Sequence, residues 1–145
     1  MNDVLQSRDS LQETKVIVLI PTQGRPNELS RALESVRNQT RQPDGMVIVH
    51  ECETDLGGSD RTDWAWPAVF AANLRTHNLS GAVNQGIDEI LIRRLEWGLN
   101  PDSTYLALLD DDDWWDERYL EHCVATVTTS DTDLAVAGIQ RYDVD

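Results

Sequence analysis

Four consecutive aspartates, at positions 110–113, are the residues whose type and spacing most clearly indicate chemistry. They directly follow the largely apolar run 105–109 and precede two tryptophans. Adjacent carboxylates repel one another, which raises some pKa values or requires a cation. An acidic run is usually a solvated surface, but its position at the end of a buried strand favours a hard divalent cation, Mg²⁺ or Mn²⁺. Charge alone does not decide which aspartate binds the ion, although Asp110 and Asp112 would point the same way if strand geometry continued.

The elements that must position these aspartates follow from the hydrophobic pattern. Continuous apolar runs at 16–20 and 46–49 predict strands buried on both faces of a parallel sheet. Strand and helix patterns alternate along the chain, so the predicted fold class is α/β, with a mostly parallel sheet covered by helices on both faces. The expected strands are 16–20, 46–49, 74–76, 105–109 and 134–138; the expected helices are 26–39, 80–97 and one around 120–127, with a short helix at 68–72.

Ligands of such sheets bind at the carboxyl ends of the strands. Segments 21–25, 50–55 and 110–113 should therefore lie near one another. His50 ends a predicted strand at this place and is a further candidate site residue. Neither a dinucleotide-binding fingerprint nor a P-loop motif occurs in the sequence.

Length and composition exclude several classes of protein. The chain has 145 residues, which predicts one domain, and a formal net charge of -14. That charge disfavours general nucleic-acid binding, and no apolar run approaches the roughly 20 residues of a membrane span. Residues 1–14 are polar and predict a flexible N-terminal tail. The two cysteines form no disulfide framework, which indicates small buried side chains in a reducing cytoplasm.

Four segments, in order, resemble the N-terminal, nucleotide-binding part of the family 2 inverting glycosyltransferases, which have the Rossmann-like GT-A fold. Residues 16–25 resemble the family's opening strand and its Pro-Thr-x-x-Arg turn, and residues 29–40 its first helix with the L-x-S-x-x-x-Q ending. Residues 78–87 are similar to the segment N-x-G-x-x-x-A-x-N-x-G-I, slightly altered. Residues 108–113 match the L-D-x-D-D signature, the DxD motif of these enzymes. The resemblance implies that residues 15–145 form the nucleotide-sugar-binding part of a GT-A domain.

The resemblance also implies a nucleotide-diphosphate sugar as donor and a Mn²⁺ or Mg²⁺ ion bridging its diphosphate. By position, Asp110 and Asp112 are the DxD pair; Asp112 is the first candidate metal ligand and Asp113 its rival. Asp110 is expected on the ribose side. The implied donor-binding residues are Pro21, Thr22, Arg25, His50, Glu51, Asp110 and Asp111.

Two departures from the family pattern bear on function. Residues 50–55, His-Glu-Cys-Glu-Thr-Asp, stand where the family usually has D-D-G-S-x-D, so the base preference is open. The family's general base lies well beyond the DxD motif, and no candidate for it is found in this sequence. The chain therefore reads as a truncated enzyme, an excised domain or a binding-only relative. An incomplete sheet edge would expose apolar surface and favour a homodimer.

Three functions are therefore weighed. The first is metal-dependent transfer of a sugar, with inversion, from a nucleotide-diphosphate donor to an unidentified acceptor hydroxyl. The second is a non-catalytic nucleotide-sugar-binding module that lacks the acceptor half and general base. The third is a haloacid-dehalogenase-type phosphatase with Asp110 as nucleophile, which is disfavoured because those enzymes carry the motif on their first strand.

Overall fold

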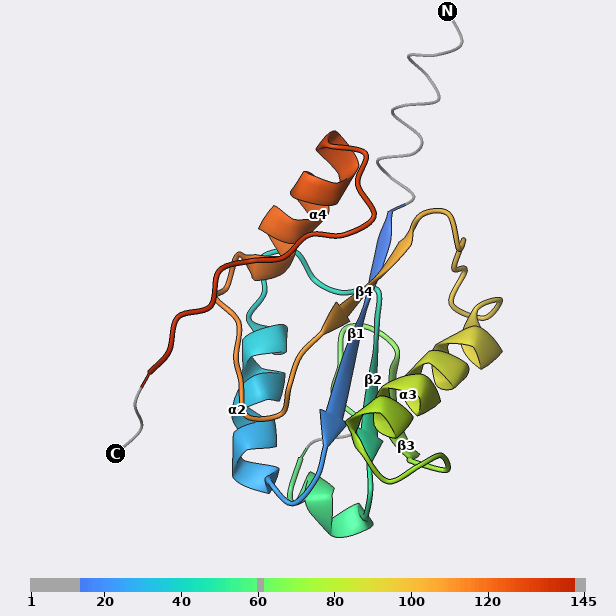
Figure 1. Cartoon of the computed structure of the whole chain (residues 1–145), viewed down its shortest axis with the longest axis vertical. Coiled ribbons are helices and arrows are strands. Elements are labelled where there is room, and N and C mark those ends of the chain that lie inside the picture. Colours follow the sequence, from blue (N-terminus) through green and yellow to red (C-terminus); the bar gives the residue numbers. More distant parts are fainter. Residues whose placement is uncertain (1–13, 60–61, 143–145) are drawn as a thin grey trace, which may run out of the picture.

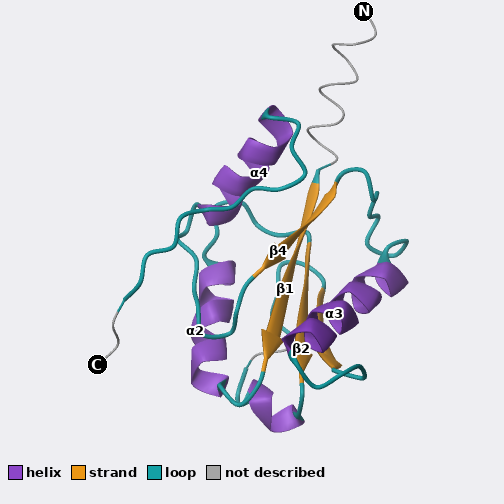
Figure 2. Ribbon diagram, viewed as in Figure 1, coloured by secondary structure: helices purple, strands orange, loops and turns teal. Residues whose placement is uncertain are grey.

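Four parallel strands form the centre of the molecule (Figures 1 and 2). The computed structural model describes residues 14–59 and 62–142. The tail expected over residues 1–14 lies outside the described residues except for Thr14. The strand order is β3-β2-β1-β4, so β3 and β4 are the edge strands. The strands are β1 (Lys15–Thr22), β2 (Gly45–His50), β3 (Ala68–Ala72) and β4 (Thr104–Leu108).

Helices cover both faces of this sheet, as the sequence predicts. Helix α2 (Pro26–Arg37) follows β1 and begins with a proline at its first position, where no backbone N–H is needed. Helix α4 (Tyr119–Thr129) packs on the same face as α2, and α3 (Leu79–Arg93) covers the opposite face (Figure 1). A short 3₁₀ helix, η1 (Glu53–Leu56), follows β2. The predicted α/β class is confirmed, and the sheet, predicted as mostly parallel, has only parallel pairs among the described strands.

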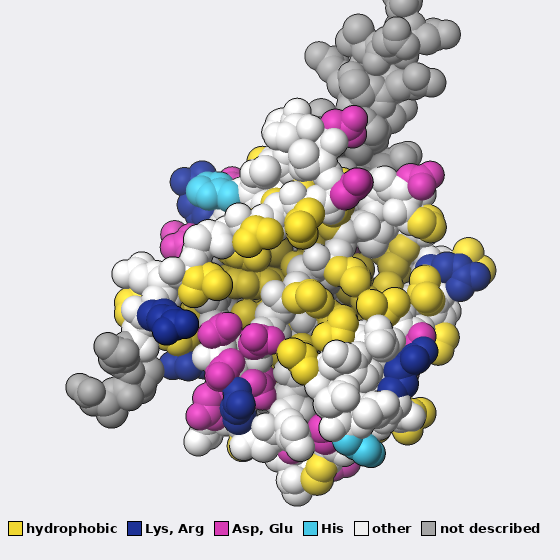
Figure 3. All heavy atoms as spheres, in the orientation of Figure 1, with side chains coloured by type: hydrophobic (Ala, Val, Ile, Leu, Met, Phe, Trp, Pro, Cys, Tyr) yellow, Lys and Arg dark blue, Asp and Glu magenta, His cyan; other side chains and the backbone are white. Residues whose placement is uncertain are grey.

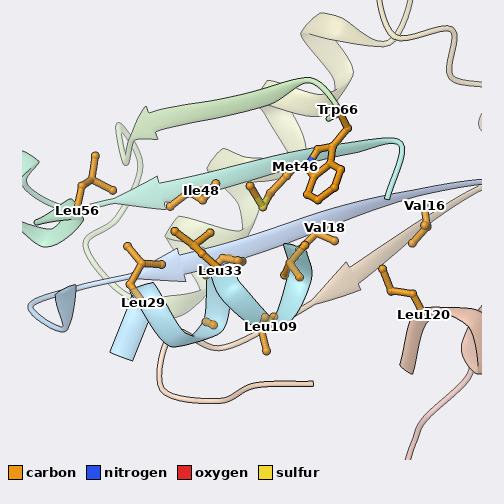
Figure 4. Packing of buried hydrophobic residues seen from close by; sticks show 13 residues of the cluster. Val16, Val18, Leu29, Leu33, Met46, Ile48, Leu56, Trp66, Leu109 and Leu120 are labelled. Atoms are coloured by element: carbon orange, nitrogen blue, oxygen red, sulfur yellow. The ribbon is translucent and has the colours of Figure 1, made fainter. Parts of the chain in front are cut away.

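Alternate side chains of β1 and β2 enter two hydrophobic clusters, one on each face of the sheet. Figure 4 shows the larger cluster, in which Val18 and Ile48 from the sheet meet Leu29 and Leu33 from α2, and Leu120 from α4 closes one end. The smaller cluster joins β1 and β2 to α3. The continuous apolar runs in the sequence therefore reflect strands that are buried on both faces.

Glycine permits close approach of α3 to the sheet. A Cβ atom on Gly86 would lie 2.1 Å from Cδ1 of the fully buried Leu19. A Cβ atom on Gly81 would lie 1.8 Å from the Thr76 carbonyl oxygen, and the Asn78 side chain caps this helix by accepting from the Gly81 N–H (2.7 Å). The glycines of segment 78–87 therefore position α3.

Three of the predicted elements are wrong. Residues 68–72 form the edge strand β3, paired in parallel with β2, and not a short helix. Residues 74–76, predicted as a strand, lie in the loop after β3, and residues 134–138 form no strand. Each error has the same physical cause: a short segment with a weak local pattern takes its structure from whether a sheet edge is available to it.

Two further expectations are corrected. Helix α3 ends at Arg93, short of the predicted residue 97, so Leu95 lies beyond the helix and is 85% exposed. Cys52 is exposed and Cys123 half-buried, and both are free thiols, so the expected burial does not hold for Cys52. Within residues 14–59 and 62–142, no helix combines the length and the apolar character needed to cross a membrane.

Candidate functional site

The loops that follow β1, β2 and β4 meet at one edge of the sheet, because parallel strands present their carboxyl ends together. After β4 the chain turns sharply: the Asp113 N–H donates to the Asp110 carbonyl oxygen (3.1 Å). Strand geometry thus stops at Leu108, and a turn, not strand alternation, orients the aspartates. Figure 3 shows acidic side chains gathered at the lower left of the face, with a basic side chain among them.

Asp111 points inward and is the buried member of the four aspartates. Its Oδ2 accepts from the Thr22 hydroxyl (2.9 Å) and the Gln23 N–H (3.2 Å), and its Oδ1 from Arg25 (3.2 Å). Its side chain is 8% exposed. Asp111 therefore fastens the loop after β1 to the loop after β4.

Asp110, Asp112 and Asp113 point outward and form an exposed cluster. Each offers a carboxylate oxygen, and these oxygens lie within 4.8 Å of one another. Partial burial, followed by repulsion from the neighbouring aspartates, raises the pKa of Asp110, and Arg25 opposes this shift. Three convergent oxygen ligands beside open solvent suit Mg²⁺ or Mn²⁺, which keep several waters and take few protein ligands. The donor set fits the predicted ion and adds Asp110 to the predicted pair.

Arg25 forms ion pairs with two of the four aspartates. Its Nη1 lies 3.2 Å from Oδ1 of Asp111 and 2.7 Å from Oδ2 of Asp112. The guanidinium therefore bridges the buried aspartate and one of the outward ones. The structure thus brings Thr22, Arg25 and the four aspartates together, as expected from the sequence.

Asp55, which the sequence reasoning did not single out, fastens the loops after β1 and β2. Its Oδ1 accepts from the Gly24 N–H (2.8 Å), and its Oδ2 accepts from the N–H groups of Glu51 (3.0 Å) and Cys52 (2.9 Å). Gly24 has φ +64°, a conformation that favours glycine. The signal was present, because Asp55 stands at the last acid of the family pattern D-D-G-S-x-D. Asp55, in the loop after β2, and Asp111, in the loop after β4, therefore both hold the β1–α2 loop by hydrogen bonds.

Glu51 and His50, both predicted to bind donor, are engaged elsewhere in this structure. Glu51 accepts from the Asn73 amide (2.8 Å) and contacts the His77 imidazole, so it joins the loops after β2 and β3. Asn73 is buried and was missed in the sequence. The His50 side chain is 5% exposed, with Nε2 3.7 Å from Oε1 of the exposed Glu53 and a buried Nδ1 that has no hydrogen-bond partner. Neither residue lies in the carboxylate cluster.

Pro21, another predicted donor contact, is half-buried in β1 beside Val49 of β2. No described interaction joins its side chain to the aspartates. Pro21, His50 and Glu51 therefore stay predictions as donor-binding residues.

The end of α2 supports the segment that follows the aspartates. The Ser35 hydroxyl accepts from the Trp115 N–H (3.1 Å). The buried Gln39 amide donates to the Asp116 carbonyl oxygen (2.7 Å) and accepts from the Leu120 N–H (2.9 Å). The serine and glutamine of the L-x-S-x-x-x-Q pattern thus fix the path from the aspartate turn into α4.

Comparisons with known proteins give the family and support the fold. Residues 17–145 match the model of the family described as glycosyl transferase family 2. The chain is 24% identical over 135 residues to the glycosyltransferase GlyA of Streptococcus pneumoniae serotype 4, an alignment that covers 92% of this chain and 18% of GlyA. It also resembles the crystal structure of S. aureus TarS, with a TM-score of 0.52 and 16% identity, over 80% of this chain and 20% of TarS. The chain thus spans about a fifth of the length of each.

The TarS likeness supports the fold alone, because the identity is low. The family model covers nearly all described residues, including the four segments that carry the sequence resemblance. The acidic cluster after β4 is compatible with the DxD motif expected for that family. The chain therefore belongs to glycosyl transferase family 2.

Proposed function

We propose that this chain binds a nucleotide-diphosphate sugar and provides the donor-binding part of a metal-dependent glycosyl transfer with inversion. The observation that carries the proposal is the convergence of the Asp110, Asp112 and Asp113 carboxylates at the carboxyl end of β4. The protein has a net charge of -14 and would repel a diphosphate without a cation at this place. The chain covers about a fifth of each protein compared with it, so the transfer reaction is proposed for it.

Asp112 and Asp113 would hold Mn²⁺ or Mg²⁺, with Asp110 as the third carboxylate of the cluster. When bound, such an ion neutralises diphosphate charge and stabilises the departing nucleotide. Thr22, at the end of β1, and Arg25, in the loop after it, would lie beside the nucleoside, with the Arg25 guanidinium on the side of the diphosphate. The Asp111 and Asp55 hydrogen bonds keep this loop in place and so orient the donor.

Inverting transfer also needs a base to take the proton of the acceptor hydroxyl as it attacks the anomeric carbon. The described residues beyond α4 include two carboxylates, Asp131 and Asp133, and neither belongs to the carboxylate cluster. We therefore assign no general base. The same carboxylate cluster would also serve a second candidate function, a nucleotide-sugar-binding module without its own transferase activity.

The first test is calorimetric titration of the protein with ADP, GDP, CDP and UDP and with UDP-glucose and GDP-mannose. Each titration is performed with Mn²⁺ and with EDTA. We expect nucleotide binding with Mn²⁺ and none with EDTA. Asp112→Asn should weaken nucleotide binding about tenfold or more, because even substitution of residues that only support metal ligands lowers metal affinity by about that factor. The matched control is Asp102→Asn, which removes the same charge in the turn before β4, at the opposite end of the strand.

The outcomes separate the candidates. Binding of no nucleotide in the presence of Mn²⁺ would refute the donor site. Metal-dependent binding with Mn²⁺-dependent release of nucleotide from the bound sugar, lost in Asp112→Asn, would support catalysis. Metal-dependent binding without any turnover, with monosaccharide acceptors supplied, would favour the binding module.

We also propose a homodimer and a compartment. Strand β4 is an edge strand with exposed Leu106 and Leu108, which supports a homodimer through that edge. The free thiols of Cys52 and Cys123 are compatible with a reducing cytoplasm as the compartment.

A further inference from the structure

Arg25 contacts two carboxylates that differ in how firmly they are held. Asp111 is 8% exposed and accepts from Thr22 and Gln23 in addition to Arg25. Asp112 has a half-exposed side chain, and Arg25 is the described cation nearest its carboxylate. The guanidinium is therefore anchored at Asp111, while its contact with Asp112 is exposed and replaceable.

Asp112 is also one of the three carboxylates that converge on the candidate cation position. A guanidinium 2.7 Å from Oδ2 of Asp112 competes with a divalent cation for the same negative charge. The two cations also repel each other when both are close to this carboxylate. Occupation of Asp112 by Arg25 and by a metal ion thus oppose each other.

An exposed ion pair contributes little to stability, so breaking the Arg25–Asp112 contact costs the fold little. Arg25 would keep its bond to Asp111, and the donors that leave Asp112 would become available on the side of the outward aspartates. A guanidinium offers five N–H donors in a plane and pairs well with phosphate oxygens. Once a metal ion has displaced Arg25 from Asp112, the guanidinium is thus suited to bind the diphosphate that arrives with the metal.

We propose that Arg25 is a replaceable counter-ion: it neutralises Asp112 in the metal-free protein and moves to the diphosphate when the cation takes Asp112. This proposal rests on the proposed donor site, and it assigns Arg25 a role in coupling metal and nucleotide binding. Arg25 acts here as a positioning residue. The coupling makes nucleotide and metal bind better together than either binds alone.

The main variant is Arg25→Gln, which removes the charge and keeps most of the side-chain length. Mn²⁺ alone should bind this variant about five- to tenfold more tightly than the wild type, because a competing positive charge within ion-pair distance is gone. At saturating Mn²⁺, the nucleoside diphosphate that binds the wild type best among ADP, GDP, CDP and UDP should bind about tenfold more weakly, because a charge-assisted contact is lost. The two effects have opposite signs, which a general loss of structure would not produce.

Free Mn²⁺ is measured by electron paramagnetic resonance, without nucleotide and without any activity. Arg31→Gln is the matched control, since Arg31 on α2, the helix that Arg25 precedes, donates to the Asp112 backbone carbonyl (3.2 Å) and stacks over Trp114, but forms no described ion pair with a carboxylate. An equal tightening of Mn²⁺ in Arg31→Gln would refute the proposal, because net charge and not the ion pair would then be responsible. Circular dichroism of both variants verifies the fold.

A second pair of variants tests the other end of the contact. Asp112→Asn frees Arg25, whereas Asp113→Asn removes the same charge and leaves the Arg25–Asp112 pair in place. Metal-free binding of the nucleoside diphosphate should therefore increase more in Asp112→Asn than in Asp113→Asn. Equal binding by these two variants would contradict the proposal.

The donor site and the role of Arg25 can fail separately. If the wild type binds nucleotide with Mn²⁺ but Arg25→Gln leaves Mn²⁺ affinity unchanged, the donor site stands and the counter-ion role is refuted. If neither protein binds Mn²⁺ or nucleotide, both proposals are refuted. Tighter Mn²⁺ binding with undiminished nucleotide binding would refute the movement of Arg25 to the diphosphate.

Discussion

The four consecutive aspartates lie in two different environments and therefore have different roles in the site. Asp111 is turned inward, and its two carboxylate oxygens accept hydrogen bonds from Thr22, Gln23 and Arg25. Its three neighbours are turned outward and converge. A charge run that looks uniform in the sequence therefore combines one structural anchor with three candidate metal ligands, and substitutions along it should have different effects.

Asp110 gives the first prediction, which concerns pH. Burial and the neighbouring aspartates raise the pKa of Asp110 in the folded protein above its ordinary value of 3.8. An acid with a raised folded-state pKa costs no stability below the unfolded-state pKa. The cost develops as the pH increases from that value through the folded-state pKa, because ionisation is then harder in the folded state.

Asp110→Asn should therefore be more stable than the metal-free wild type at pH 7, with a difference that shrinks toward pH 3.5. Urea unfolding in EDTA between pH 3.5 and 7 measures this, and Asp102→Asn provides the comparison for loss of one exposed charge. Saturating Mn²⁺ should reverse the order, because it stabilises only the protein with the complete cluster. A difference that is constant with pH would contradict the prediction.

Asp55 gives the second prediction. Asp55→Ala removes the acceptor for three backbone N–H groups and should destabilise the protein by about 1–3 kcal/mol, because the loops lose their hydrogen bonds to a buried, charged acceptor. Nucleotide binding should weaken as well, because the loop after β1 loses its hydrogen bond to Asp55 and is held by Asp111 alone. Urea unfolding and calorimetry measure the two effects. Glu53→Ala, an exposed carboxylate of the same turn, is the control, and an equal loss there would refute the role of Asp55.

At the scale of elements, the sequence predicts best where the determining contacts are local or continuous. Strands β1, β2 and β4 and the α-helices of the described residues, α2, α3 and α4, follow from apolar runs and helical spacing. The Ala-rich segment 68–72 was misassigned because its structure depends on the edge of β2, with which it pairs. Segment 134–138 has strand-like composition but lies outside the sheet, which no local pattern reveals.

The same reasoning explains which site residues could be predicted. The outward aspartates are adjacent in sequence, and a single turn gathers them, so their pattern was visible. Asp55 and Asn73 act by joining loops that follow different strands. Their importance depends on which strands are neighbours in the sheet, a property of the folded chain and not of any short segment.

Packing of α3 on the sheet gives the third prediction. Gly86→Ala should destabilise the protein by about 1–3 kcal/mol, because the added methyl group overlaps Cδ1 of Leu19, even though alanine favours helix. Combining it with Leu19→Val, which removes the overlapping atom, should recover part of this loss. A double-mutant cycle from urea unfolding measures the coupling. Additive effects of the two changes would show that the contact does not limit the approach of the helix.

At the scale of the whole molecule, the sheet ends in an unprotected strand. Leu106 and Leu108 of β4 pair with Ile17 and Leu19 of β1, so they lie on the face of the sheet that α3 covers. They are nevertheless 43% and 55% exposed. Figure 3 shows a broad hydrophobic area over β4, between α4 and α3. An exposed edge strand without charged side chains is a template for pairing with another strand.

A second copy of β4 is the partner that this edge fits by symmetry, because two such strands can pair antiparallel about a two-fold axis. Each copy carries a net charge of -14, so repulsion opposes the contact and salt should strengthen it by screening. Sedimentation equilibrium at 50 and 500 mM NaCl should therefore show a dimer fraction that increases with salt, and Leu106→Lys or Leu108→Lys should abolish it. Ile92→Lys, at a 72% exposed position on α3, should leave the dimer intact. A monomer at both salt concentrations would refute pairing through β4, since the apolar edge would then be too weak to overcome the charge repulsion. Equal loss of the dimer in all three variants would also refute it, since association would then occur elsewhere.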